Sequence, residues 1–454
     1  MLIFGILLGS LLAGNILKKG IPFLKNSLIP TSVLGGSILL LAAAIYKWST
    51  GDIMFDSEAF GHNGTQTLEI ITYHALALGF IASSFKTTGS KLTKKRADEI
   101  FNTGVTTVST YLLQGVVGLG ITLVVALIIP GFFGASGILL PFGYGQGTGQ
   151  ALNYGNIYET EHGFIGGRSF GLTIAAMGFL SAALGGVLHL NVMKRTGRLI
   201  TSSRTDGSLH TEEVDSDSEI PMQESADKMT IQIALIVVAY MLAYVIMLGL
   251  GALLPGMKSV IFGFNFLLGV ITATLIKLSM NFLRKKGIMK KKYTNNFLMT
   301  RASNFFFDLM IVSGIAAIRI DVLESYWVVM IILGVIGAVI TYAYNRFVAK
   351  KLFPDYTEEQ FLMMYGMLTG TASTGIILLR EIDVNFKTPA SDNMVYQNFP
   401  AIVFGFPLML LATLAPVKPI LTLIILIAFF IVMNIILFRH QLLRIKRNRT
   451  NSNK

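Results

Sequence analysis

Cysteine is absent from this chain of 454 residues, and charged residues make up only 14% of it. The absence of cysteine excludes disulfides, a thiolate nucleophile and any metal site with cysteine ligands. The scarcity of charge, beside 53% hydrophobic residues, leaves too little polar surface for a soluble protein of this length. The composition therefore predicts an all-α polytopic membrane protein.

Sequence signatures of common enzyme classes are also missing. The chain contains no HExxH, no GxSxG and no GxxxxGK[ST], the motifs of zinc hydrolases, nucleophile elbows and phosphate-binding loops. Their absence disfavours an enzyme and an ATP-driven pump, and we expect no cofactor. A membrane-embedded transferase that uses His162 or His189 with a carboxylate is the enzymatic alternative.

The apolar residues fall into eleven segments, each close to the roughly 20 residues that cross a bilayer as a helix. The first segment has no Lys or Arg before it, so we interpret it as a membrane span and not as a signal peptide. In chain order the segments cover residues 2–17, 28–46, 68–85, 104–129, 164–190, 231–254, 260–280, 302–320, 326–344, 395–414 and 420–438.

The net charge of +12 would suggest nucleic acid as a partner if the chain were soluble. Here, however, Lys and Arg cluster after the odd-numbered segments, for example at residues 86–96 and 284–292, while Asp and Glu follow the even-numbered ones. Short loops rich in Lys and Arg stay on the cytoplasmic side of a membrane. We therefore expect no nucleic-acid binding, and a multi-pass protein of the cell membrane with its N-terminus outside and its C-terminus in the cytoplasm.

A polar stretch divides the apolar segments. Residues 194–229 are mixed in charge and poor in aromatic residues, which is typical of a segment that cannot fold alone. We interpret it as a cytoplasmic linker between an N-terminal half, residues 1–193, and a C-terminal half, residues 230–416. A final span and a basic cytoplasmic tail occupy residues 417–454. Each half then has five spans.

Each half also carries a glycine-rich interruption between its fourth and fifth spans. The first is GYGQGTGQALNYG, residues 143–155, in a loop at 130–160, and the second is YGMLTGTASTG, residues 365–375, in a loop at 357–390. Irregular backbone is tolerated at membrane depth only where it is buried in protein or lines a water-filled cavity. Because five is odd, the second half enters from the opposite side, which predicts two inverted repeats, each with a re-entrant loop. Such paired interruptions point to a transporter's binding site.

The residue types in these interruptions suit both a cation and an anion. Glycine lets the backbone turn and approach a ligand closely, and threonine hydroxyls can join unwound carbonyl groups as sodium ligands. The free N–H groups of a helix N-terminus attract carboxylates. The alternative is that each interruption is an ordinary connection outside the membrane.

The plan of two five-span halves, a cytoplasmic linker and two oppositely oriented re-entrant loops resembles the sodium/glutamate symporter family and, more distantly, the sodium-coupled citrate symporters. The most specific pieces are GYGQGTGQA, HGFIGGRSFGLTIAAMGFL and TGTASTGIILL. Loops in such families carry paired glycines followed by small hydroxyl residues. The residues that match, and that the resemblance implies bind substrate, are Gly145, Gly147, Thr148, Gly149, Gly370, Thr371, Ala372, Ser373 and Thr374.

The resemblance implies sodium-coupled symport of L-glutamate or a related anionic amino acid by alternating access, with sodium as the coupling ion and a homodimer in the lipid bilayer. A sodium- or proton-coupled symporter of di- or tricarboxylates is the alternative. A channel is a further alternative, because glycine-rich re-entrant loops also build selectivity filters. An inverted pair within one chain favours alternating access.

Three isolated polar residues are further candidates. Asn304 and Asp308 lie one helical turn apart, and a carboxylate inside a membrane is functional by default. We expect them to bind the coupling cation with Thr148 and Thr371; the alternative is a purely structural pair. Arg168 opens the fifth span, where its guanidinium can hold a substrate carboxylate or extend to lipid headgroups.

Overall fold

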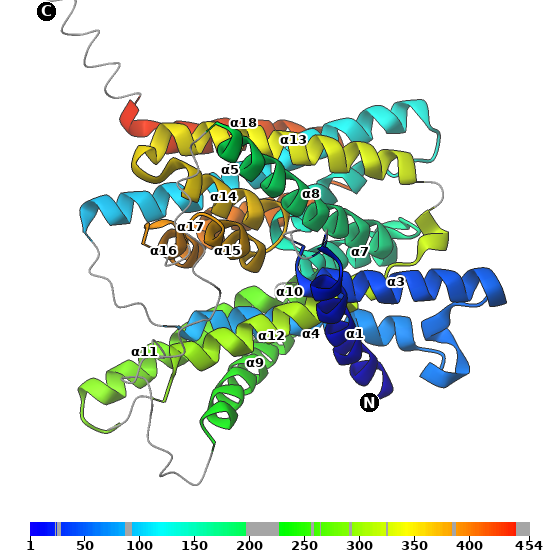
Figure 1. Ribbon diagram of the computed structural model, residues 1–454, viewed down its shortest axis with the longest axis horizontal. Helices are drawn as coiled ribbons and strands as arrows, with labels where there is room; N and C mark the ends of the chain where they lie inside the picture. The colour runs from blue at the N-terminus through cyan, green and yellow to red at the C-terminus, as the bar shows by residue number, and fades with distance from the viewer. Residues whose placement is uncertain are drawn as a thin grey trace, which may run out of the picture.

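The structure is a computed structural model, and it describes residues 1–22, 24, 29–86, 93–196, 227–255, 258–263, 265–289, 293–323, 326–383 and 387–441. Every regular element in these ranges is a helix (Figure 1). The linker expected at residues 194–229 lies mostly outside the described residues, which stop at 196 and resume at 227.

Nine helices in the described ranges are long and apolar enough to cross a membrane. A helix that is apolar over most of its surface and carries few charges is stable in lipid, where its backbone satisfies its own hydrogen bonds. The chain is therefore an all-helical polytopic membrane protein. The nine helices are α1 Leu2–Gly20, α3 Thr31–Thr50, α4 Gly64–Phe85, α5 Lys94–Ile128, α8 Gly167–Arg195, α9 Lys228–Leu253, α11 Asn265–Lys285, α13 Trp327–Leu352 and α18 Pro419–Leu437.

The other helices are shorter or more polar. Short 3₁₀ helices occupy Met54–Asp56, Glu58–Phe60, Gly134–Ile138, Ile320–Leu323 and Pro354–Tyr356. The remaining α-helices are α6 Leu139–Gln146, α7 Thr148–His162, α10 Lys258–Gly263, α12 Asn296–Ala316, α14 Thr357–Thr369, α15 Ala372–Arg380, α16 Ala390–Tyr396 and α17 Asn398–Leu414.

Two of the eleven expected spans, at residues 302–320 and 395–414, differ from the nine apolar helices. The first corresponds to α12, which is long enough but less apolar, since it carries Arg301, Asn304 and Asp308. The second corresponds to α17, which has only 17 residues. Helix α12 begins before the expected span, because backbone hydrogen bonding continues into the polar residues that precede its apolar part. The expected span at 395–414 is divided at Gln397, between α16 and α17.

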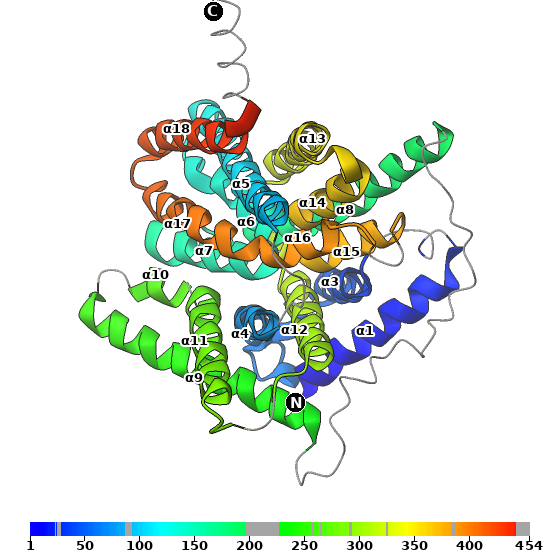
Figure 2. The same ribbon diagram turned by 90° about the vertical axis from the view of Figure 1, so that its left-hand side faces the viewer.

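The helices form two groups that lie one above the other in Figures 1 and 2. The first helix group contains α1, α3, α4, α9, α10, α11 and α12, and the second helix group contains α5 to α8 and α13 to α18. In the first group α12 packs against α3 and α4; in the second group α5 packs against α13, α17 and α18. The chain visits the first group, the second, the first and the second again, so both halves of the sequence contribute helices to both groups.

The main contact between the groups involves α7. This helix of the second group packs against α4, α10 and α12 of the first group, and α8 packs against α12. The polar stretch around residues 143–155 therefore lies at the boundary between the groups.

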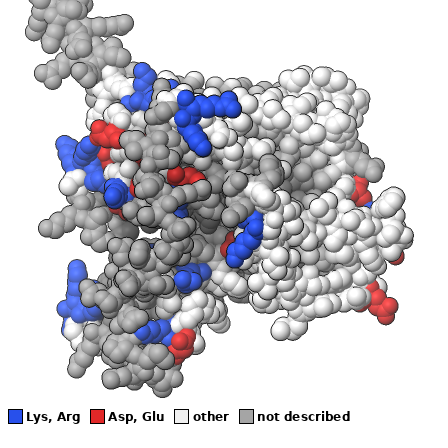
Figure 3. Space-filling view, viewed as in Figure 1, with Lys and Arg blue, Asp and Glu red and all other residues white. Residues whose placement is uncertain are grey.

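Charged side chains are distributed unevenly along the helix axes. Figure 3 shows Lys and Arg crowded at the left end of the molecule, whereas Asp and Glu predominate at the right end. The basic end includes the first turn of α5 and the last turns of α11 and α13. A charge asymmetry of this kind is typical of membrane proteins, whose Lys and Arg residues concentrate on one side.

Candidate functional site

The first polar interruption folds as a helical hairpin. Gly147 joins α6 to α7 and has a φ of +80°, a conformation that glycine adopts without steric cost. The residues on both sides of Gly147 are helical, although we expected a loop across residues 143–155. Nearly all side chains from Leu139 to Tyr158 are buried, so packing within the second group and against α4 supplies the stability that this polar sequence lacks alone.

The second interruption also folds as a helical hairpin. Gly370 and Thr371 join α14 to α15. A Cβ placed on Gly366 of α14 would lie 2.8 Å from Cα of Gly375 of α15, so glycine on both arms permits their close approach. The Gln114 side chain of α5 donates a hydrogen bond of 3.0 Å to the carbonyl of Leu368, next to the hairpin tip. This contact ties the tip to the second group.

The tips of the two hairpins lie against each other. A Cβ placed on Gly147 would lie 3.5 Å from Cγ2 of Thr371 and 3.9 Å from the carbonyl oxygen of Gly370. It would also lie 3.6 Å from the end of the Met310 side chain on α12. Both interruptions and one helix of the first group therefore meet at a single point.

Around the first tip, the expected site residues are closely packed. Thr148 is fully buried and its hydroxyl donates a hydrogen bond of 3.2 Å to the carbonyl of Met310. Gly149 faces Leu76 of α4, because a Cβ on it would lie 2.8 Å from Cβ of Leu76. Gly145 lies against the ring of Tyr111, whose hydroxyl donates to the Gly145 carbonyl at 3.0 Å.

Around the second tip, the expected residues are less covered. Thr371 and Ala372 are half-buried, while Thr374 is fully buried. The hydroxyl groups of Thr371 and Thr374 are 3.4 Å apart. A Cβ on Gly370 would meet the Thr374 hydroxyl at 2.9 Å. The backbone of Ser373 is helical, but its side chain lies outside the described residues.

Each tip is also the beginning of a helix. Helix α7 begins at Thr148 and α15 begins at Ala372. The residue before α7 is Gly147, which has no side chain, and the side chain of Thr371 before α15 makes no capping hydrogen bond to the described residues. The first N–H groups of an α-helix have no partner within the helix and carry a partial positive charge. Such groups can bind a carboxylate, while the carbonyl and hydroxyl oxygens of the tips can ligate a cation.

The two polar residues of α12 lie in different surroundings. Asp308 is half-buried and lies beside the hydroxyl of Ser32 on α3. Asn304, one turn earlier, is exposed. Asp308 is only two residues from Met310, whose carbonyl accepts the hydrogen bond from Thr148. Residues two positions apart on a helix do not face the same way, so Asp308 faces α3 whereas Met310 faces the first tip.

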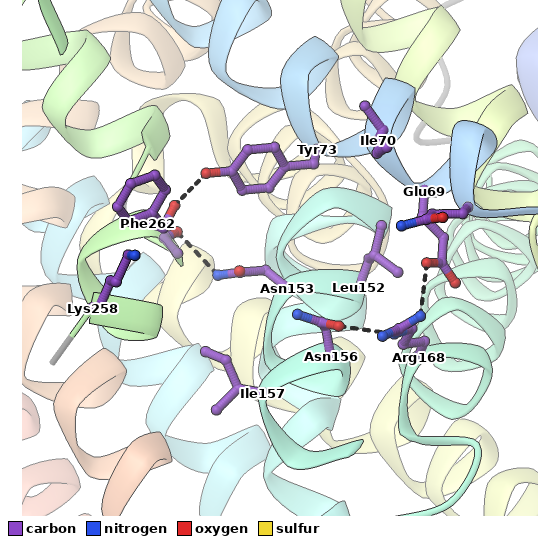
Figure 4. Close-up of a pocket in the computed structure, with 12 residues that line it drawn as sticks. Glu69, Ile70, Tyr73, Leu152, Asn153, Asn156, Ile157, Arg168, Lys258 and Phe262 are labelled. Carbon is purple, nitrogen blue, oxygen red and sulfur yellow. Dashed lines mark hydrogen bonds and ion pairs between the residues drawn. The ribbon is translucent and has the colours of Figure 1, made fainter. Parts of the chain in front are cut away.

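A cavity of about 460 Å³ lies between the two helix groups. It is bounded by α4 and α10 of the first group and by α7 and α8 of the second, as Figure 4 shows. Charged and amide side chains line it together with several apolar ones. The lining residues with polar side chains are Gln66, Glu69, Tyr73, Asn153, Asn156, Arg168 and Lys258.

Arg168 binds three neighbours at one end of this cavity. Its guanidinium donates to Glu69 of α4 at 3.1 Å and to the side-chain oxygen of Asn156 at 2.8 Å. Its backbone N–H donates to Glu159 at 3.1 Å. Because α4 belongs to the first group and α8 to the second, the Arg168–Glu69 ion pair links the two groups (Figure 4).

Other polar contacts also fix the walls of the cavity. The Asn153 side chain donates to the carbonyl of Gly263 at 3.0 Å, and the Tyr73 hydroxyl donates to the carbonyl of Phe262 at 2.6 Å. The sequence predictions included Arg168 but not Glu69, Asn153 or Lys258. A carboxylate within an apolar span is a signal that applies to Glu69 as much as to Asp308. Asn153 and Lys258 line the same cavity because α7 packs against α10. No local sequence pattern predicts that packing.

Titratable groups elsewhere have structural partners. Nδ1 of His74 lies 2.6 Å from the Tyr240 hydroxyl, and His189 lies 2.7 Å from the Tyr342 hydroxyl and 2.8 Å from Glu358. Across the described ranges, no three His, Asp or Glu side chains come together in a way that could hold a metal ion.

After the second hairpin, the Asp383 carboxylate has hydrogen-bonding partners a few positions further along the chain. It accepts hydrogen bonds from the backbone N–H of Lys387 at 2.8 Å and from the hydroxyl of Thr388 at 2.6 Å. Burial acts to raise the pKa of Asp383, but the hydrogen bonds from Thr388 and from the backbone outweigh it and hold the pKa below its usual value of 3.8.

The all-helical architecture and its nine apolar helices place the chain in the class of polytopic membrane proteins. No protein-family model matches the chain, and no curated protein matches it. Its function is therefore inferred from the geometry of the hairpins and the cavity.

Proposed function

We propose that the chain is a secondary active transporter, a sodium-coupled symporter of L-glutamate or a closely related small anion that works by alternating access. The observation that carries the proposal is the meeting of two glycine-containing hairpin tips, one from each half of the chain, beside α12. Their helix N-termini offer N–H groups to a carboxylate, and their backbone and hydroxyl oxygens suit a dehydrated cation.

An inverted repeat is supported by the pattern of helix contacts. Contacts between helices occur in matching pairs when each helix of the first half is compared with its counterpart in the second. The counterparts, in chain order, are α1 and α9, α3 and α11, α4 and α12, α5 and α13, and α8 and α17. The contact of α1 with α3 matches that of α9 with α11; α3 with α12 matches α11 with α4; α8 with α13 matches α17 with α5. This correspondence counts α12 and α17 as spans, giving eleven in all, and makes the hairpins equivalent elements of the two repeats.

The uneven distribution of Lys and Arg supports a topology with the basic end in the cytoplasm (Figure 3). In that topology the N-terminus is outside, the C-terminus is cytoplasmic, and the hairpins enter the cell membrane from opposite sides as re-entrant elements. Residues 1–193, 230–416 and 417–454 are then the first repeat, the second repeat and a final span with its tail.

For the coupling ion, we assign sodium to the region between the tips and α12. Thr148 and Thr371 bring hydroxyl oxygens to this region. Asp308 belongs to the proposal as a carboxylate of α12, the helix that borders the tips. Asn304 belongs to the same proposal, although its side chain is exposed. No other cofactor is proposed.

The substrate is proposed to be an anion because the tips present helix N-termini and because Arg168 lines the adjacent cavity. A second candidate is a sodium- or proton-coupled symporter of di- or tricarboxylates, which the presence of two cationic side chains, Arg168 and Lys258, in the same cavity favours. The homodimer implied by the family resemblance is part of the same proposal.

Radiolabelled uptake into proteoliposomes tests the function directly. We expect an inward sodium gradient to drive accumulation of glutamate above its external concentration and a sodium ionophore to abolish it. A panel containing aspartate, succinate and citrate separates the two substrate classes. The absence of uptake, or equal uptake without sodium and proton gradients, would contradict the symporter; a channel would equilibrate the anion without concentrating it.

A further inference from the structure

The cavity between the helix groups is separate from the hairpin tips. Among the residues that the structure describes, its lining comes from α4, α7, α8 and α10 and includes neither Gly147 nor residues 370–374. Its volume of about 460 Å³ falls within the roughly 300–1,000 Å³ typical of small-molecule sites. The cavity therefore has room for a small ligand of its own.

Two cationic side chains lie at separate points of the cavity lining. Arg168 and Lys258 bring two positive charges to its lining, and Glu69 brings one negative charge. Glu69 pairs with Arg168, whose side chain is about one third exposed. Lys258 is exposed to the same cavity on α10, and Figure 4 shows it on the opposite side of Asn153 from Arg168. Glu159, beside the lining, also lies 3.9 Å from the Arg168 guanidinium. The two cationic groups of the lining are therefore well separated, and Arg168 already has carboxylate neighbours.

The partner of Arg168 is a carboxylate supplied by the protein itself. A guanidinium recognises any carboxylate of suitable geometry through the same charge-assisted hydrogen bonds. A ligand carboxylate that reached Arg168 would compete with Glu69 for these donors. Asn156, which already accepts from the same guanidinium at 2.8 Å, would hold Arg168 in place during the exchange.

We propose that this cavity binds a small dicarboxylate, with one carboxylate replacing Glu69 on Arg168 and the other lying near Lys258. Because Glu69 and Arg168 belong to different helix groups, the exchange removes an ion pair between the groups when the ligand arrives. The inference rests on the dicarboxylate candidate of the proposed function and gives it a site. Binding is measured without any ion gradient, so it can fail while glutamate uptake at the hairpin tips succeeds, and the reverse.

An ordinary structural ion pair makes the opposite prediction for one variant. If Glu69 competes with the ligand, Glu69→Gln frees Arg168 and strengthens dicarboxylate binding. If the pair only stabilises the fold, Glu69→Gln lowers thermal stability and leaves binding unchanged or weaker. The sign of the change in affinity therefore separates the two cases.

The lack of cysteine provides a local probe. Gln66 lines the cavity and is exposed, so Gln66→Cys can be alkylated with a hydrophilic maleimide in purified full-length protein without any ion gradient. The measurement is the concentration of succinate or glutarate that halves the alkylation rate, with propionate as the monocarboxylate comparison. Lys418→Cys, exposed at the start of α18 and outside the cavity, is the control for nonspecific effects.

We expect dicarboxylates to protect Gln66→Cys and not Lys418→Cys. Adding Glu69→Gln should lower the half-protecting concentration roughly tenfold, and Arg168→Gln should remove protection in either background. Lys258→Gln should make succinate no better than propionate. Arg168→Lys keeps the charge without the planar group and should give weaker protection. It replaces Arg168→Gln in the experiment if Arg168→Gln does not fold.

Two results would overturn the proposal. One is the absence of dicarboxylate protection even in the Glu69→Gln background; the other is protection that Glu69→Gln fails to strengthen or that Arg168 variants do not alter. Neither result bears on glutamate uptake through the hairpin tips, which is measured separately in proteoliposomes.

Discussion

The two hairpins share a plan but differ in what covers them. Residues 148–155 of the first hairpin are all buried, whereas Thr371, Ala372, Ile376 and Ile377 of the second are only half-buried. The second helix of the first hairpin, α7, packs against three helices of the first group. The corresponding arm of the second, α15, packs mainly on α14, α16 and α8 of its own group.

This difference indicates how tightly each hairpin is held. A helix packed between two groups must lose many contacts before it can move, while a half-covered arm opens at a lower free-energy cost. In the proposed topology the second hairpin enters from the cytoplasm. The second hairpin is therefore expected to be the one that moves, whereas the first is held between the two groups beside the cavity that α7 lines.

The largest expected effect comes from adding bulk to the first hairpin. Gly149→Val places side-chain carbons where Leu76 of α4 already lies, since a Cβ there would be 2.8 Å from Leu76. Overpacking of this kind costs about 1–3 kcal/mol. Ala372→Val on the half-covered arm should cost much less. Thermal unfolding measures both, with Gly249→Val as control because a Cβ at Gly249 meets open space. Equal losses at Gly149 and Ala372 would remove the distinction between the hairpins.

The next effect concerns the carboxylate of α12. Asp308→Asn keeps the shape of the side chain but removes its negative charge. If Asp308 helps to bind sodium, the sodium concentration for half-maximal uptake should rise about tenfold, which corresponds to roughly 1.4 kcal/mol. An unchanged sodium dependence would assign Asp308 to its structural contact with Ser32. If Asn304 shares the site, Asn304→Ala should also raise the sodium requirement; an unchanged value would remove this exposed residue from the proposal.

A smaller effect distinguishes the threonines of the two tips. Thr148→Val removes the hydrogen bond to Met310 at a fully buried position and should lower the stability by about 1 kcal/mol. Thr371→Val should change the thermal stability less, because Thr371 is half-buried, yet raise the sodium requirement for uptake. A Thr371→Val protein with normal sodium dependence would exclude its hydroxyl as a ligand.

The smallest effect is a pH dependence after the second hairpin. The folded-state pKa of Asp383 lies below its usual value of 3.8, so its contribution to stability is complete above that value and is lost as the pH falls through the folded pKa. Limited proteolysis near residues 383–388 should therefore accelerate at acidic pH. Asp383→Asn should show faster cleavage at neutral pH and a weaker acceleration in acid; identical profiles would contradict the stabilising role of its hydrogen bonds.

Sequence patterns located both hairpins but not their form. The glycine and threonine content of residues 143–155 predicted an irregular loop, yet within that stretch only Gly147 is not helical. Burial against neighbouring helices overrides the low helix propensity of glycine and asparagine there. Propensity alone could not show this, because the stabilising contacts come from distant parts of the chain.

Contacts between distant residues were the least predictable feature. Spacing suggested that Asn304 would partner Asp308, but Ser32 of α3 is the residue beside Asp308 and Asn304 is exposed. Arg168 was recognised as a candidate, while its partner Glu69 lies 99 positions away. Helical periodicity places residues on faces and leaves undetermined which faces meet.

The most direct test of the proposed alternating-access site is the accessibility of the second hairpin. Ala372→Cys should react with a hydrophilic maleimide from the cytoplasmic side in sodium-free buffer, whereas Ala151→Cys, at a fully buried position of the first hairpin, should not. Addition of sodium and glutamate together should protect Ala372→Cys by closing the site. Equal reaction rates with and without sodium and glutamate, or reaction from the outside only, would contradict a binding site at the hairpin tips.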